Sequence, residues 1–245
     1  MLKFFRAIRK NLIEEDNVRK YILYDIGEIL LVVIGILIAL QVNNWNEERK
    51  NKQQTTQYLT SLKSDLIEDI RVLNEGFDYA FADSVLIDNQ IRRIKESDVH
   101  PDTVKNIILN EFNSSVRNRR PFNRKTYNTL ISSGDIGLLS NETAQRLVLL
   151  MNEQDIRNGL IQGTIDIYLP VVTSFYQSYP VNGLPLSDII FPEMYSDIDV
   201  LQLLKEFNNM LSAKQLNSER HMQISRLLEQ PTLELIELID QQIHN

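Results

Sequence analysis

Residues 21–45, YILYDIGEILLVVIGILIALQVNNW, decide the fold of this chain. The centre, residues 29–40, carries no polar side chain, and residues 21–42 extend about 33 Å as a helix, enough to cross a bilayer core of about 30 Å. Tyr21 and Tyr24 lie at one end and Trp45 at the other, as aromatic side chains do at membrane interfaces. We therefore predict a transmembrane helix over residues 21–45 with Trp45 as an interface anchor.

The charges before this stretch predict its orientation. Residues 1–20 hold six Lys and Arg against three Asp and Glu, a net charge of +3 (6 − 3), and the positive-inside rule places them in the cytoplasm. They form either a basic amphipathic helix on the inner leaflet or a plain topogenic tail. No A-x-A site follows the apolar run, which favours an uncleaved anchor over a signal peptide. Residues 46–245 are then expected outside the cytoplasm.

One side of the predicted span differs from the other. At 100° per residue, its polar, aromatic and small residues share a stripe, formed by Tyr21, Tyr24, Asp25, Glu28, Val32, Gly35, Ala39 and Val42. Gly35 and Ala39 form a small-xxx-small pair, which predicts a helix contact with a second copy or with another membrane protein. Asp25 and Glu28 have two interpretations: a stator-like, ion-coupled subunit, or headgroup-level positions within a helix contact.

The sequence resembles a known family in two places. Residues 21–50, YILYDIGEILLVVIGILIALQVNNWNEERK, and residues 126–142, TYNTLISSGDIGLLSNE, are similar to an uncharacterised family of small bacterial membrane proteins. The resemblance implies one N-terminal span, an extracytoplasmic helical domain and no assigned activity. We therefore expect the span in the bacterial inner membrane and the helical domain in the periplasm or otherwise outside the cytoplasm.

A second helix signal follows the span. Apolar residues recur at steps of three and four and predict a long helix over residues 46–97, as part of a bundle core or a coiled coil. These residues are Leu59, Leu62, Leu66, Ile70, Leu73, Phe77, Ala80, Ile87, Ile91 and Ile94. The charged residues on its other faces are predicted to be solvated; they include Lys63, Asp65, Glu68, Asp69 and Arg71.

The remaining segments predict further helices, so the fold class is all-α: a single transmembrane helix followed by a helical bundle. Helices are expected over residues 101–116, 122–132, 197–212 and 214–243, the last kinked at Pro231. Another, capped by Ser140 or Asn141, is expected to stop near Pro170. Residues 133–137 predict a turn. The Pro-rich residues 178–193 predict an irregular loop that serves as a lid, a binding loop or a plain connector.

A basic run is the most notable polar feature outside the span. Its cations predict either a patch for an anion or an acidic partner, or a solvated connection between helices; they are Arg117, Arg119, Arg120, Arg124 and Lys125. The chain as a whole has a net charge of -7, which argues against a nucleic-acid partner.

Signatures of catalysis and of metal binding are missing from the sequence. It has no Cys, which excludes disulfides and thiolate chemistry, and its three His (His100, His221, His244) fit no HExxH or Glu-x-x-His pattern. Gly134-x-x-Gly137 predicts a turn because no Lys-Ser/Thr follows it. His221 is expected at a solvated helix position. We therefore predict no enzyme, cofactor or metal.

The function predicted from these features is assembly. We expect an interaction, scaffold or accessory subunit bound to the lipid bilayer, to a second copy or to another membrane protein. The alternatives are a stator-like subunit and a ligand-sensing bundle, the latter disfavoured because only about twenty residues are expected in the cytoplasm.

Overall fold

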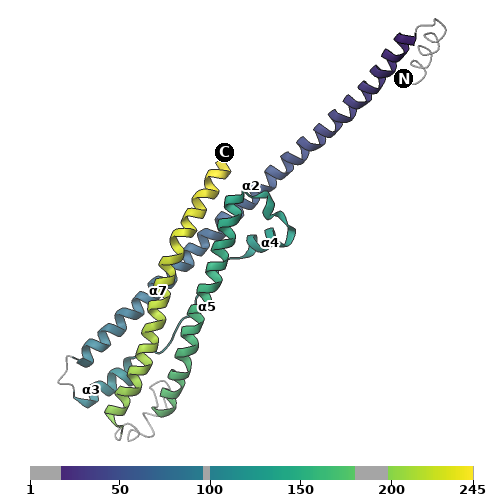
Figure 1. The fold of residues 1–245 in the computed structure, drawn as a ribbon. Coiled ribbons are helices and arrows are strands. Elements are labelled where there is room, and N and C mark those ends of the chain that lie inside the picture. Colours follow the sequence, from purple (N-terminus) through teal and green to yellow (C-terminus); the bar gives the residue numbers. More distant parts are fainter. Residues whose placement is uncertain (1–17, 96–99, 180–197, 245) are drawn as a thin grey trace. The chain divides into compact units, whose positions relative to one another are not determined.

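The computed structural model describes residues 18–95, 100–179 and 198–244, and within these ranges all regular secondary structure is helical. The α-helices are α2 (Val18–Lys95), α3 (Pro101–Asn106), α4 (Lys125–Ser133), α5 (Asn141–Ser178) and α7 (Val200–His244) (Figure 1). Two short turns of helix complete them, the π-helical η1 (Ile107–Glu111) and the 3-10 helix η2 (Asp135–Leu138). The all-α prediction is confirmed for the described residues. Most of the predicted segment 1–20 and of the loop 178–193 lies outside them.

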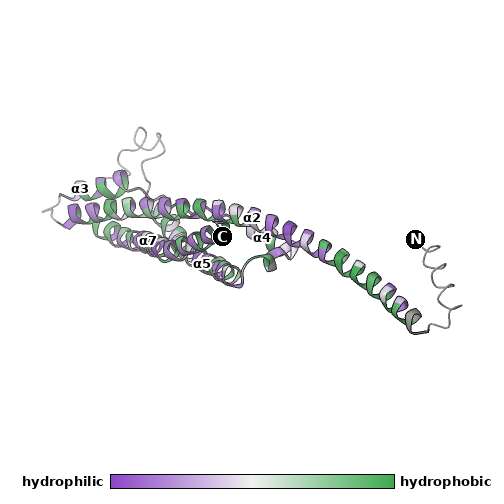
Figure 2. Ribbon diagram, turned by 90° about the horizontal axis from the view of Figure 1, so that it is seen from above, coloured by the Kyte–Doolittle hydropathy of each residue, from purple (hydrophilic) through white to green (hydrophobic). Residues whose placement is uncertain are grey.

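The chain divides into two compact units, Met1–Gln57 and Tyr58–Asn245. In the first unit, α2 contains a mostly apolar stretch (Figure 2), and its large apolar residues from Ile22 to Val42 are all exposed. This stretch is long and apolar enough to cross a membrane, and no residue of its most apolar window is buried. A signal sequence near an N-terminus would meet the same test.

In the second unit, α2 buries the apolar stripe that its sequence predicts. Leu62, Leu73 and Ile87 are among its fully buried residues, and the helix ends at Lys95, close to the predicted position 97. One expectation about its charged residues is wrong. Asp69 is completely buried, because its carboxylate accepts hydrogen bonds from the Asn123 backbone N–H (2.7 Å) and the Gln154 side-chain amide (2.9 Å).

The prediction of a helix over residues 101–116 is wrong at its C-terminal end. Helical structure stops at Glu111, and residues 112–124 form an extended connecting segment. Its backbone groups find partners outside a helix: the Asn113 side chain accepts from the Ser115 N–H (2.9 Å), and the Tyr168 hydroxyl donates to the Ser114 carbonyl (2.7 Å).

The next helix and the turn after it agree closely with the sequence. α4 begins at Lys125, three residues later than predicted, and ends before Gly134, whose φ of 77° is a left-handed conformation that glycine adopts without steric cost. Ser140 then caps α5 by accepting a hydrogen bond from the Thr143 N–H at 3.1 Å.

Two predicted helix ends are absent. α5 continues through Pro170 to Ser178, because a proline removes only one backbone donor and Tyr168, Val172 and Phe175 around it are buried. The predicted helices over 197–212 and 214–243 are one helix, α7, which also contains Pro231. The residues at the expected break, Ala213 and Lys214, are both buried.

The core of the second unit has two apolar clusters. One contains residues from α2, α4, the first half of α5 and the second half of α7, such as Leu73 and Leu235. The other contains residues from α3, η1, the second half of α5 and the first half of α7, such as Phe175 and Phe207. Of the partly buried residues, Val116 of the connecting segment packs against both. The middle of α7, between the two clusters, carries buried polar residues.

Candidate functional site

The inward face of α7 changes from apolar to polar for about three turns. Its buried positions follow steps of three and four from Leu203 through Phe207 and Met210, and again from Ile224 through Leu228. From Lys214 to Ser225 most buried residues of α7 are polar and at most 3% exposed, and we call these the polar layer: Lys214, Asn217, Ser218, His221 and Ser225. Buried polar groups need partners, so each member requires an account of its bonds.

The first residues of the polar layer have partners. The Lys214 ammonium lies 2.9 Å from the Asp83 carboxylate of α2 and also donates to the Asn113 carbonyl. The Asn217 side-chain amide donates to the Thr164 hydroxyl at 2.8 Å. Asp83 interrupts the apolar stripe of α2 between Ala80 and Ile87, so the ion pair spans two facing helices.

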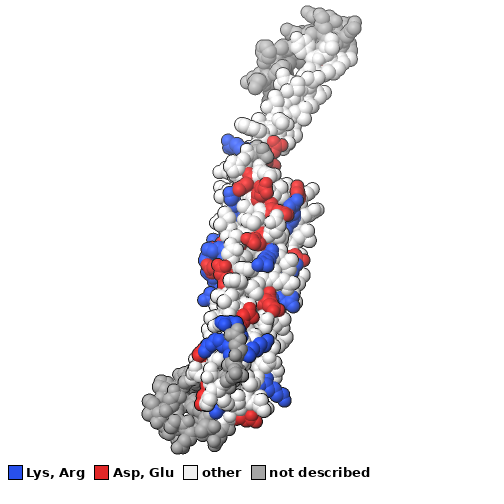
Figure 3. All heavy atoms as spheres, turned by 90° about the vertical axis from the view of Figure 1, so that its left-hand side faces the viewer, with Lys and Arg blue, Asp and Glu red and all other residues white. Residues whose placement is uncertain are grey.

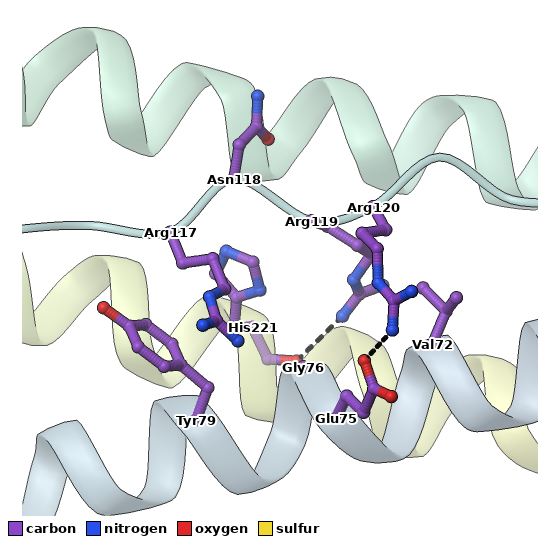
Figure 4. Close-up of a pocket in the computed structure, with 9 residues that line it drawn as sticks. All are labelled: Val72, Glu75, Gly76, Tyr79, Arg117, Asn118, Arg119, Arg120 and His221. Atoms are coloured by element: carbon purple, nitrogen blue, oxygen red, sulfur yellow. Dashed lines mark hydrogen bonds and ion pairs between the residues drawn. The ribbon is translucent and has the colours of Figure 1, made fainter.

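The connecting segment passes over the other end of the polar layer, and Arg117, Arg119 and Arg120 reach towards the pocket whereas Asn118 points the other way (Figure 4). Arg117 stacks over the Tyr79 ring, 4.8 Å from its centroid. Asn118 points towards α5, where it donates to Gln162 at 3.3 Å. Arg119 reaches inward and donates to the Ser225 hydroxyl at 2.8 Å and to the His221 carbonyl at 3.3 Å.

These side chains enclose a pocket of about 410 Å³ in the second unit. Residues from α2, from the connecting segment and from α7 line it: Val72, Glu75, Gly76, Tyr79, Arg117, Asn118, Arg119, Arg120 and His221 (Figure 4). Arg120 forms an ion pair with Glu75 across its mouth, and this hydrogen bond lowers the pKa of the Glu75 carboxyl. Gly76 leaves the floor open: a β-carbon there would lie 3.5 Å from the Arg119 Nε atom.

Arg119 carries a charge that no acidic residue neutralises among the described residues. Burial lowers the pKa of its guanidinium to about 10, so the group still holds its proton at neutral pH. Its Nε and Nη1 atoms are buried and have no hydrogen-bond partner in the described part of the chain. A buried cation without a counter-charge is costly, so this side chain is not explained by the fold alone.

His221 is the second polar group left incomplete. Its ring is 3% exposed, and both ring nitrogens lack a hydrogen-bond partner in the ranges described. Burial, and then the charge of Arg119, lower its pKa to about 4, so the imidazole is neutral at pH 7. The prediction of a solvated His221 is therefore wrong. The step of seven from Lys214 to His221, which continues the buried spacing of α7, is the signal that could have placed it.

The structure brings together three of the five predicted basic residues. Arg117, Arg119 and Arg120 line the pocket, whereas Arg124 turns to α5, where it donates to the Met151 carbonyl (2.8 Å) and to Asp155 (2.5 Å). Lys125 is exposed at the start of α4. Whether the run binds an anion stays a prediction.

The two other histidines have local roles. His100 is the N-cap of α3 and its Nδ1 atom accepts from the Asp102 N–H at 3.4 Å, and His244 contacts the Asp240 carbonyl at 2.8 Å. Across the described ranges, no three His, Asp or Glu side chains gather as a metal site would require.

The predicted contact stripe lies in the first unit, on α2. Tyr24, Val32, Gly35, Ala39 and Val42 are exposed, as is the predicted interface anchor Trp45, and Asp25 and Glu28 are partly covered and interact with other groups. The Tyr21 side chain lies outside the described residues. What packs against this stripe stays a prediction.

A row of apolar side chains on the outside of α5 was not anticipated. Leu149, Ile156, Leu160 and Ile167 are all exposed, by 45% to 63%, and their spacing of seven, four and seven residues places them on one face of the helix. We call them the α5 row.

On the face of the molecule in Figure 3, blue and red side chains are interspersed, and no large area of one sign appears there.

Comparison with known proteins gives a family and no activity. No curated protein and no solved structure matches the chain. The match is to the "Family of unknown function (DUF6090)" and covers residues 28–163, which is more than half of the 245 residues. It includes residues 28–45 of the apolar stretch, the connecting segment and the first part of α5. The chain therefore belongs to this family of unknown function, DUF6090.

Proposed function

We propose that this chain is a single-pass membrane protein that works by assembly, as a scaffold or accessory subunit. Its N-terminus faces the cytoplasm, residues 21–45 cross the inner membrane of a bacterium, and the helical second unit lies outside the cytoplasm. It assembles with a second copy or with another membrane protein. The positive charge of residues 1–20 supports this orientation, and the resemblance of residues 21–50 supports the bacterial membrane.

The observation that carries the proposal is the exposure of the apolar stretch. From Ile22 to Val42 the large apolar side chains of α2 are about half exposed or more. Burying one such side chain is worth roughly 1.5–3 kcal/mol, so leaving the whole stretch in water costs tens of kcal/mol. A lipid bilayer removes this cost. The continuous helix also satisfies its backbone hydrogen bonds internally, as a membrane span requires.

Two surfaces support assembly. Gly35 and Ala39 lie on one face of α2, and no neighbouring group of the described residues lies within 4 Å of where a Gly35 β-carbon would be, which allows close approach of another helix. The α5 row adds an exposed apolar face to the second unit, and contiguous surfaces of this kind mark protein contacts. The pocket favours a second function, ligand binding, which is developed below.

Purification from native membranes in a mild detergent tests the proposal. We expect the full chain to resist alkaline extraction and to elute either at a multiple of 28.5 kDa or with a stoichiometric second membrane protein, identified by mass spectrometry. Gly35→Leu is expected to weaken this assembly. Gly27→Leu is the matched control, because it makes the same change about 100° away from the stripe.

Three outcomes would contradict the proposal. Release of the chain by alkaline carbonate would reject the anchor, and a mature chain that lacks residues 1–45 would identify a signal sequence instead. A monomer without partners, unaffected by Gly35→Leu, would reject assembly through the span.

A further inference from the structure

We propose that the pocket between α2, the connecting segment and α7 binds a small anionic molecule through a carboxylate or phosphate group. The anion would sit between the buried guanidinium of Arg119 and the ring of His221 (Figure 4). The inference goes beyond the proposed function, because the pocket lies wholly in the second unit and needs no membrane anchor.

The pairing of the neighbouring cations sets Arg119 apart. Arg120 pairs with Glu75, Arg124 with Asp155 and Lys214 with Asp83. Arg119 is more buried than Arg120, yet among the described residues its hydrogen bonds go only to neutral oxygens, those of Ser225 and His221. Its Nε and Nη1 atoms remain as donors. A planar guanidinium with two such donors matches the oxygens of a carboxylate or a phosphate.

His221 supplies a second donor from the opposite side. The neutral imidazole carries one N–H, which an oxyanion accepts, and this bond would satisfy a ring nitrogen that has no partner within the described ranges. A single bound anion would account for two polar side chains that lack hydrogen-bond partners. They come from two different elements and line the same pocket.

The rest of the lining limits the ligand. A volume of about 410 Å³ fits a small metabolite, and Val72 and Tyr79 offer apolar surface for its carbon atoms. Arg120 in the lining is already paired with Glu75, so fewer free cations remain for an extended polyanion. On the visible face of Figure 3 charges of both signs alternate, which likewise gives a nucleic acid no basic track. A molecule with one or two negative charges is therefore the class that fits.

The test uses the full chain in detergent and two probes, inorganic phosphate and benzoate, which present the two kinds of oxyanion. We expect saturable heat of binding and a rise in melting temperature with at least one of them, and the stronger probe identifies the group recognised. Arg119→Met is expected to weaken binding by about tenfold or more, since it removes a charged hydrogen bond.

Gly76→Leu provides an independent variant, because its side chain would occupy the pocket beside the Arg119 guanidinium, whose Nε atom lies 3.5 Å from the position of a β-carbon at Gly76. We expect it to abolish binding. Arg146→Gln is the matched control: Arg146 is an exposed cation of α5 that pairs with Glu142, so its loss makes the same charge change away from the pocket. This variant should bind as the wild type does.

The inference is overturned if neither probe gives saturable binding, or if Arg119→Met and Gly76→Leu bind as tightly as Arg146→Gln does. Circular dichroism confirms that each variant is folded. A chain that assembles in the membrane but binds neither probe would reject this inference alone. A chain that binds a probe but leaves the membrane on alkaline extraction would reject only the proposed function.

Discussion

Two basic side chains enter the middle of the second unit, and the chain treats them differently. Lys214 comes from α7 and meets the Asp83 carboxylate at 2.9 Å, with both side chains less than a tenth exposed. Arg119 comes from the connecting segment, donates hydrogen bonds to hydroxyl and carbonyl oxygens, lies over the Phe122 ring at 5.8 Å from its centroid, and has no acidic partner within the described residues. The first arrangement is complete in itself and holds helices together. The second leaves two buried donor atoms without hydrogen-bond partners in the described residues, which is the arrangement that the proposed anion would complete.

Breaking the complete pair should produce the largest effect. Lys214→Met leaves the Asp83 carboxylate buried without its cation, and we expect the free energy of unfolding to fall by about 3–5 kcal/mol. Urea unfolding of the full chain in detergent, followed by circular dichroism, measures this change.

A double variant isolates the pair. Adding Asp83→Leu to Lys214→Met removes the stranded charge, so the double variant should be more stable than Lys214→Met alone. Equal or greater loss in the double variant would show that the pair contributes through its packing and not through its charges.

The acid sensitivity of the polar layer comes next. The folded pKa of His221 is about 4, against 6.5 for a free histidine, so protons bind the unfolded chain more readily. This contribution to stability is fully present above pH 6.5 and is lost as the pH falls from 6.5 to 4. A difference of about 2.5 pH units corresponds to roughly 3 kcal/mol.

His221→Leu separates this loss from other titrations. Asp69 opposes it, because burial raises the pKa of that carboxyl and favours the folded state as the pH falls. The difference in unfolding free energy between wild type and His221→Leu, measured at several pH values, should decline by roughly 3 kcal/mol between pH 6.5 and pH 4. A difference that stays constant over this range would mean that His221 is accessible to water.

The sequence predicted the helices where packing repeats along the chain. Leu59 to Ile94 follow one stripe, and Gly134 and Ser140 carry local turn and cap signals that need no distant partner. The predictions were wrong where contacts with residues far away in the sequence determine the conformation. The connecting segment is extended because its residues bond to groups 54 and 106 positions away, Asp69 for Asn123 and Ser225 for Arg119. The order and spacing of residues within the segment do not identify these distant partners.

The candidate site was predicted only as a set of basic residues. Which of them share a pocket depends on how the connecting segment turns its side chains: Arg117, Arg119 and Arg120 face the pocket, whereas Asn118 points away from it. His221 was predicted to be solvated because its neighbours Glu219 and Arg220 are charged. That prediction overlooked its position seven residues after Lys214, on the same face of the helix. Extending the three- and four-residue spacing of buried positions in α7 across its polar residues would have placed His221 in the core.

The smallest effect should come from the cation without a counter-charge. Arg119→Met removes hydrogen bonds to Ser225 and His221, but it also removes a buried charge, and we expect a change of about 1 kcal/mol or less in unfolding free energy. The same substitution at Lys214 should cost several times more. Arg119→Met should also raise the pKa of His221, because it removes the second cause of the depression, and so weaken the acid sensitivity described above. A loss as large as that of Lys214→Met would show that Arg119 is already compensated by the fold, and the pocket would then have no unmet charge to attract an anion.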